Sequence, residues 1–145
     1  MPGMDAVAIE RQLGEFFRAR AAAERIAAAW LFGSVARGTA RPESDVDVGV
    51  LFREDPPRTL AGYHFDLEAD LQELLRLPVQ LVVLNRAPVD LAFRVLQDGK
   101  LLVNQDPSRR IRFELRTHNE YWDMEPSWRL YRKERGELDR HRSRL

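Results

Sequence analysis

Asp45 and Asp47 are the residues of this chain whose type and spacing most directly predict chemistry. The stretch 45–50 places three valines in strict alternation with other residues, the pattern of a β-strand with unlike faces. The two aspartates therefore share one face, about 6–7 Å apart along the strand, while the valines point into the core. Like charges on one face repel unless a cation lies between them. Oxygen ligands without His or Cys favour Mg²⁺ or Mn²⁺, so the pair predicts a divalent-metal site. Gly49, next on the same face, adds no side chain to it.

A glycine-serine turn supplies a second element of the same chemistry. Gly33 and Ser34 follow a short apolar run, 26–32, that is typical of a buried strand. A glycine there lets the backbone approach a ligand, and the amides that open a following helix favour phosphate oxygens. The Ser34 hydroxyl can donate to the same oxygens, and Arg37 lies close enough to act as a cation for them. A phosphate site beside a metal site is the minimum equipment for phosphoryl or nucleotidyl transfer.

The helices and strands that must position these residues are predicted by the spacing of apolar residues and by the proline, glycine and capping residues between them. Apolar spacing predicts a first helix, a Leu-rich second helix that ends before Pro78, and a further helix that begins at Pro88. Asp106 and Pro107 have the form of an N-cap followed by the first residue of a last helix. Such an alternation of helices and strands describes one α/β layered domain. Strands are expected at 26–32, 45–50, 79–84 and 101–103, and helices at 5–22, 60–75, 88–98 and from 106 onward.

Composition limits the class of protein. The 145 residues are 44% hydrophobic and 32% charged, as in an ordinary globular domain, and their formal net charge is zero, so the total does not favour a nucleic-acid partner. The absence of cysteine excludes disulfides, thiolate catalysis and cysteine-bound metals. The longest apolar run is too short to span a membrane, and the first ten residues have no basic signal-peptide region. We therefore expect a cytoplasmic protein.

Charge divides the chain into two parts. Residues 126–145 carry seven basic and three acidic side chains, whereas residues 1–105 carry twelve and fifteen. We expect a domain over residues 1–125 and a basic C-terminal helical extension over residues 126–145, with a break at Pro126. Mixed charge of this kind is usual for a solvated helix. The aromatic residues around Pro126 are expected in the core, with a partner surface as the alternative.

The combination of these motifs resembles the polymerase-β-like nucleotidyltransferase superfamily. Gly33-Ser34, ten further residues and then Asp45-Val46-Asp47 match its signature, and the fuller run over 33–47 resembles the minimal nucleotidyltransferase (MNT) branch. The resemblance covers roughly residues 5–125. It implies a mixed β-sheet in a single two-layer domain with helices packed on one face, followed by a C-terminal helix.

The same resemblance implies an activity and a partner. Many members of the MNT branch are antitoxins of HEPN ribonuclease toxins, and they transfer AMP from ATP to a tyrosine of the toxin. By this resemblance Asp45 and Asp47 hold Mg²⁺ or Mn²⁺ and act in catalysis, while Gly33, Ser34 and Arg37 bind the nucleotide.

Gln80 departs from the pattern that the resemblance implies. Family members carry a third carboxylate at this position, where it ligates the metal and can accept the proton of the attacking hydroxyl. A glutamine keeps a carbonyl oxygen but has neither negative charge nor a basic site. General-base help is worth about 10²–10⁴ in rate. Asp66 and Asp70, on the preceding helix, are the alternatives for this role, although each fits a solvated helix face.

Three functions remain open from the sequence. The first is an adenylyltransferase that modifies a toxin, and the second is a weakened or inactive relative that neutralises its toxin by binding alone. The third is a nucleotidyltransferase of small molecules, which the short chain disfavours because no second domain is available to build an acceptor pocket.

Overall fold

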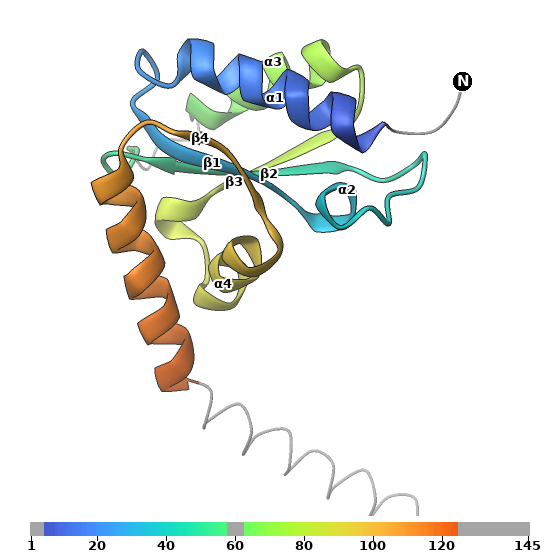
Figure 1. Cartoon of the computed structure of the whole chain (residues 1–145). Coiled ribbons are helices and arrows are strands. Elements are labelled where there is room, and N and C mark those ends of the chain that lie inside the picture. Colours follow the sequence, from blue (N-terminus) through green and yellow to red (C-terminus); the bar gives the residue numbers. More distant parts are fainter. Residues whose placement is uncertain (1–4, 58–62, 125–145) are drawn as a thin grey trace, which may run out of the picture.

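A four-stranded mixed β-sheet with helices against both faces makes up the part of the protein that the computed structural model describes, residues 5–57 and 63–124 (Figure 1). The last helix, orange in Figure 1, is called the C-terminal helix below and is described over residues 107–124. No helix of these described residues is long and apolar enough to cross a membrane. The elements are α1 (Ala6–Arg20), β1 (Ile26–Phe32), α2 (Gly33–Arg37), β2 (Val46–Phe52), α3 (Tyr63–Leu75), β3 (Val79–Val83), a 3-10 turn (Leu84–Arg86), α4 (Val89–Asp98) and β4 (Lys100–Asn104).

The strands lie in the order β3-β2-β1-β4. β1 is antiparallel to both β2 and β4, whereas β2 is parallel to β3, so the expected mixed sheet is confirmed. The parallel pair requires a crossover, which α3 supplies on one face of the sheet. The register matters for the site: Asp47 of β2 lies opposite Phe32 of β1 on one side and opposite Gln80 of β3 on the other.

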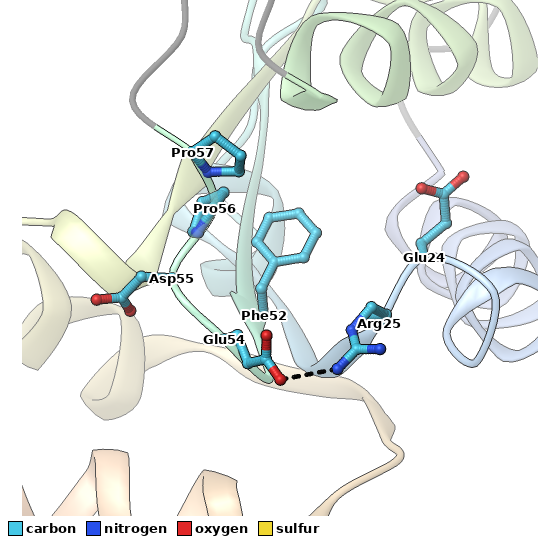
Figure 2. A pocket seen from close by; sticks show the side chains of 7 residues that line it. All are labelled: Glu24, Arg25, Phe52, Glu54, Asp55, Pro56 and Pro57. Carbon is cyan, nitrogen blue, oxygen red and sulfur yellow. Dashed lines mark hydrogen bonds and ion pairs between the residues drawn. The ribbon is translucent and has the colours of Figure 1, made fainter.

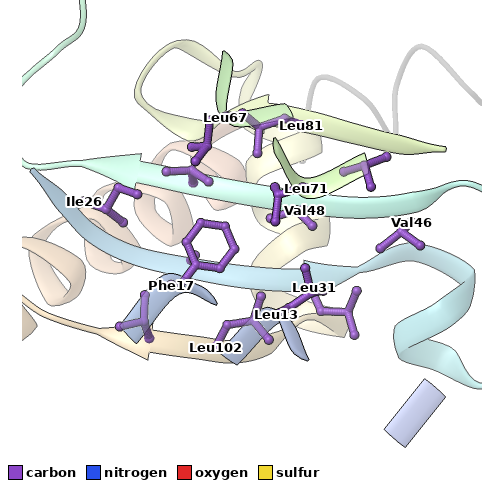
Figure 3. Packing of buried hydrophobic residues seen from close by; sticks show 14 of the residues in the cluster. Leu13, Phe17, Ile26, Leu31, Val46, Val48, Leu67, Leu71, Leu81 and Leu102 are labelled. Carbon is purple, nitrogen blue, oxygen red and sulfur yellow. The ribbon is translucent and has the colours of Figure 1, made fainter. Parts of the chain in front are cut away.

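One face of the sheet packs against α1 and α3 (Figure 3). Val46, Val48 and Val50 are fully buried in this cluster, so the predicted inward face of the second strand is confirmed. Leu13 and Phe17 of α1 belong to the same cluster, and Figure 3 shows their side chains over this face of the sheet. The alternation of β2 therefore sends Asp47 to the opposite face.

The second face is apolar too, and this differs from the expected single helical layer. Trp30, Phe32 and Leu51 form a second cluster with α4 and with Phe113 of the C-terminal helix. The rings of Trp30 and Phe113 lie 6.1 Å apart. The physical reason lies in β1, all seven residues of which are buried, because a strand without a polar side needs cover on both faces.

Capping residues set two of the helix starts. The Asp5 carboxylate accepts hydrogen bonds from the amides of Val7 and Ala8, and Asp106 accepts one from the Arg109 amide at 3.2 Å. The predicted cap at Asp106 is thus confirmed. Pro88 precedes α4 as its N-cap instead of occupying the first helical position. The expected break at Pro126 and the extension over 126–145 lie outside the described residues.

Candidate functional site

A cleft of about 740 Å³, its open mouth included, forms where β1 ends and α2 begins. It lies on the α4 side of the sheet, since Asp47 and Gln80 reach it from the face opposite the valines. Five of the six predicted site residues line it, and Asp45, which precedes β2, does not. The lining residues are Phe32, Gly33, Ser34, Arg37, Asp47, Gln80, Val82, Leu91 and Arg94.

Gly33 lies directly against the Asp47 carboxylate. Its φ of 77° falls in the left-handed region, where a side chain is strained. A methyl group placed on Gly33 would also overlap the Asp47 carboxylate oxygen. Two independent constraints therefore require glycine here, and both bring the start of α2 close to the acid.

The helix α2 is short, and its C-terminus is capped by hydrogen bonds. Gly38, with φ of 76°, ends it, and the amide of Thr39 returns a 2.9 Å hydrogen bond to the Ser34 carbonyl. The Ser34 hydroxyl is half-buried at the cleft and has no hydrogen-bond partner within the described part of the chain. Its position beside the opening amides of α2 suits an acceptor such as a phosphate oxygen.

A tight loop carries the chain from α2 to the aspartates. The Arg41 amide donates to the Ser44 hydroxyl, and the Ser44 amide donates to the Arg41 carbonyl, both at 2.9 Å. Asp45 follows this loop and is exposed, whereas Val46 begins the strand. The loop therefore positions Asp45 at the rim of the site and not on the strand itself.

Electrostatics connects the two acids with Arg37. Partial burial raises the pKa of Asp47, the nearby Asp45 charge raises it further, and Arg37 lowers it. Arg37 also lies 3.7 Å from the Asp98 carboxylate of α4. The Arg37 guanidinium thus interacts both with Asp98 of α4 and with Asp47.

Gln80 occupies the position where a third carboxylate would meet the other two. It pairs in parallel register with Asp47, its side chain is exposed, and it lines the same cleft. Asp70 forms an ion pair with Arg20 of α1 at 2.5 Å, and α3, which also carries Asp66, packs on the opposite face of the sheet. The interpretation of these two acids as substitutes for the missing carboxylate is therefore wrong.

The oxygen donors of the cleft fit a hard divalent cation. Two carboxylates and one amide carbonyl are the ligand types that Mg²⁺ takes in proteins, where substrate phosphates complete its shell. No group of three His, Cys, Asp or Glu that could hold a metal occurs among residues 5–57 and 63–124. The repulsion that raises the Asp47 pKa is relieved when a cation binds between the acids.

Four lining residues were not foreseen as site residues from the sequence: Phe32, Val82, Leu91 and Arg94. No local sequence pattern indicates that they line a site, because Leu91 and Arg94 reach the cleft only through the packing of α4 on the sheet. Gly49 also has a different role from the one expected. A side chain there would meet Leu84 and Val95 at 3.2–3.3 Å, so Gly49 makes room for α4 and not for a ligand.

A second cavity, of about 460 Å³, lies at the far end of β2 (Figure 2). Its arginine, Arg25, is paired with Glu54 at 2.9 Å. The other charged residues around it are the acids Glu24 and Asp55, so an anionic substrate would be repelled. This second cavity is therefore a poor candidate for nucleotide chemistry.

The sheet order, the glycine turn against an acid and the cleft are together those of a nucleotidyltransferase. Residues 13–108 match the family described as polymerase beta, nucleotidyltransferase. The chain belongs to this family. No curated protein matches the sequence.

Solved structures share the fold. A toxin–antitoxin complex with AMP-PNP contains a chain 25% identical to this one, with a TM-score of 0.70 over 86% of this chain and 96% of that one. A minimal nucleotidyltransferase is 34% identical, with a TM-score of 0.56 over 67% of this chain and 95% of that one. A complex of a tri-AMPylated Shewanella oneidensis HEPN toxin with its MNT antitoxin gives 20% identity and a TM-score of 0.67, over 86% and 97% of the two chains. That last likeness shows the fold alone.

The raised pKa of Asp47 predicts that Asp47→Asn stabilises the metal-free protein. The pKa of Asp47 is higher in the folded than in the unfolded protein, so the ionised carboxylate destabilises the fold. This loss of stability grows as the pH rises from the unfolded-state pKa to the folded-state pKa, and it is complete above the folded-state pKa. In EDTA at pH 7 we expect the free energy of unfolding to rise by roughly 0.5 kcal/mol, discounted for partial exposure. The gain should shrink toward pH 4.

Urea unfolding at the two pH values measures this difference. Glu15→Gln, at an exposed acid in the middle of α1, is the control and should change little at either pH. A mutant at Asp47 that is less stable than the wild type at pH 7 would contradict the assignment of an unfavourable charge at this site, caused by burial first and by Asp45 second.

Proposed function

We propose that this protein binds ATP with Mg²⁺ or Mn²⁺ in the cleft beside Asp47 and transfers AMP to a tyrosine of a HEPN-type toxin, acting as its antitoxin. The single observation that carries the proposal is the approach of Gly33 to the Asp47 carboxylate in a cleft that also receives Ser34 and Arg37. Structural relatives support it: one is a toxin–antitoxin complex with AMP-PNP, and another holds an AMPylated HEPN toxin.

Each cleft residue has a role in this proposal. Asp47 and Asp45 hold the cation, with the Gln80 carbonyl as a further oxygen. When bound, the cation supplies positive charge that polarises the α-phosphate. The Ser34 hydroxyl and the first amides of α2 donate hydrogen bonds to phosphate oxygens. These contacts orient the nucleotide for in-line attack.

The reaction itself needs little covalent chemistry from the protein. The acceptor hydroxyl attacks the α-phosphorus, the bond to the bridging oxygen breaks, and pyrophosphate leaves with the electron pair. The proton of the hydroxyl passes to water or to a carboxylate, because the Gln80 amide has no basic site. Positioning and charge therefore account for most of the expected rate.

Gln80 favours a second candidate function, an antitoxin that neutralises its toxin by binding alone. The residue lies beside Asp47, where a carboxylate would complete the site, and the acids of α3 are on the other face. Apart from one oxygen for the cation, the features proposed to bind nucleotide do not depend on Gln80. The two candidates differ in turnover and not in partner.

The partner surface is proposed on the C-terminal helix. Ile111, Leu115 and Trp122 are 45%, 59% and 54% exposed, and their spacing of four and seven residues places them on one helical stripe. The Tyr121 ring stacks on Phe93 of α4 at 3.7 Å, so this helix is fixed to the element that walls the cleft. A protein acceptor that reaches the cleft can bury the stripe at the same time, and a helix of the toxin is the occupant we propose.

The acid pair predicts metal-dependent nucleotide binding. ATP should bind at least tenfold more tightly with Mg²⁺ than in EDTA, and replacing both Asp45 and Asp47 by asparagine should remove this difference, because the charges that hold the cation are lost. Calorimetric titration measures it, with Asp66→Asn as a control that keeps the metal effect. Equal metal-dependent binding in the double mutant would exclude these acids as the site.

Restoring a carboxylate at position 80 should raise transfer. Gln80→Asp, or Gln80→Glu if the longer reach is needed, adds a negative charge and a base beside Asp47. Transfer of labelled AMP to the toxin should increase about 10²-fold if the missing base limits the rate. Gln97→Glu, which adds an acid to an exposed position of α4, is the matched control.

Two outcomes would count against the limiting base. Fast transfer by the wild type with no gain in either mutant would show that no base is needed at position 80. Absence of transfer in all three proteins, with the toxin still neutralised, would support the binding-only antitoxin.

The exposed stripe predicts a toxin contact that one charge can break. Leu115→Glu should weaken the complex with the toxin about 10- to 100-fold, because it places a charge at the centre of an apolar contact. Leu74→Glu, at a leucine 41% exposed on α3 across the sheet, is the control. Co-purification and titration of the complex measure both, and equal affinity of the two variants would place the toxin elsewhere.

A further inference from the structure

Helix α4 contributes one wall of the cleft. Leu91, Arg94 and Asp98 recur at intervals of three and four residues, so they share a face of the helix. Leu91 and Arg94 line the cleft, and Asp98 pairs with Arg37 of α2. Along α4, Arg94 therefore lies between an apolar end, where Leu91 is joined by Val82 of β3, and the end held by Arg37.

The two arginines of the cleft differ in how they are engaged. Arg37 lies 3.7 Å from the Asp98 carboxylate, so part of its charge is already balanced by an acid of the protein. Arg94 is exposed and forms no ion pair with any described residue. Asp90 and Asp98 both stand four residues away on the same helix, the spacing that favours an ion pair, yet neither takes Arg94.

The charges of the proposed ligand make this difference relevant. A nucleoside triphosphate keeps net negative charge after one divalent cation has bound, and further charge develops on the pyrophosphate as it leaves. The cleft presents Asp47, with Asp45 at its rim, and the arginine Arg37, which is paired with Asp98. Of the lining residues, Arg94 is the cation whose charge is still available.

We propose that Arg94 binds the β- and γ-phosphates of the nucleotide, the part released as pyrophosphate, while Arg37 chiefly holds α2 against α4. The inference rests on the proposed nucleotide site and adds a phosphate ligand that the sequence did not indicate. The planar guanidinium suits bidentate contact with phosphate oxygens and would neutralise charge on the leaving group. Leu91 and Val82 leave an apolar wall for the nucleoside.

Arg94→Ala tests the assignment by comparing ATP with AMP. With Mg²⁺ present, calorimetry should show ATP binding weakened about 10- to 100-fold, the usual value of a lost charge-assisted contact. AMP lacks the two outer phosphates, so its affinity should change by less than about twofold. Inorganic pyrophosphate should likewise displace a labelled ATP analogue from the wild type and poorly from the variant.

Two further proteins sharpen the test. Arg94→Lys keeps the charge but loses the guanidinium fork, so its ATP affinity should fall between those of the wild type and Arg94→Ala. Arg112→Ala removes an exposed arginine of the C-terminal helix, away from the cleft, and should bind ATP as the wild type does. Equal thermal unfolding temperatures of the variants would exclude a loss of fold as the cause.

The outcomes separate this inference from the proposed function. If the wild type binds ATP with Mg²⁺ and Arg94→Ala binds it equally well, the Arg94 assignment is wrong and the nucleotide site stands. Equal weakening of ATP and AMP would also overturn it, because Arg94 would then contact the nucleoside or the α-phosphate. If the wild type itself shows no metal-dependent ATP binding, the proposed function fails and the inference fails with it.

Discussion

The contact between Gly33 and the Asp47 carboxylate is the constraint on which the site depends. Strand pairing sets it, because β1 ends at Phe32 opposite Asp47 and α2 begins at the next residue. A slip of one residue in this pairing would turn Asp47 into the valine-lined core and Val48 into the cleft. The buried valines hold the strand register. The apolar core on one face of the sheet therefore determines where the cleft residues lie on the other face.

The ionised Asp47 carboxylate is electrostatically unfavourable at the place where the ligand is proposed to bind. Asp47 is partly buried and faces the repulsion of Asp45, and both effects raise its pKa. Arg37 offsets part of this, and Asp98 of α4 holds Arg37 in turn. The destabilisation by this charge is local, and it is small beside the stabilisation that comes from the two apolar clusters on the faces of the sheet. Under the proposed function, binding of a cation would relieve this charge, as expected where function and stability compete.

The sequence predicted most of what depends on local pattern. The bounds of β1, the inward valines and the cap at Asp106 follow from periodicity and punctuation, and the structure agrees with all three. What depends on packing between distant elements was missed. The second helical layer, the filling of the space above Gly49 and the entry of Arg94 into the cleft all follow from where α4 docks, and no local signal encodes that.

The parallel pairing of β2 with β3 explains why position 80 is the place on β3 where a third carboxylate would meet Asp47. Asp47 and Gln80 are neighbours across two strands, so only this position on β3 projects beside Asp47 into the cleft. Acids on α3 cannot replace it, because the crossover carries that helix to the opposite face. Since the proposed nucleotide contacts come from α2, β2 and α4, binding and proton acceptance reside on different elements. Under the proposed function, a single substitution in β3 would therefore reduce the rate of AMP transfer while the proposed phosphate contacts persist. The antitoxin would then bind its nucleotide and its toxin more readily than it transfers AMP.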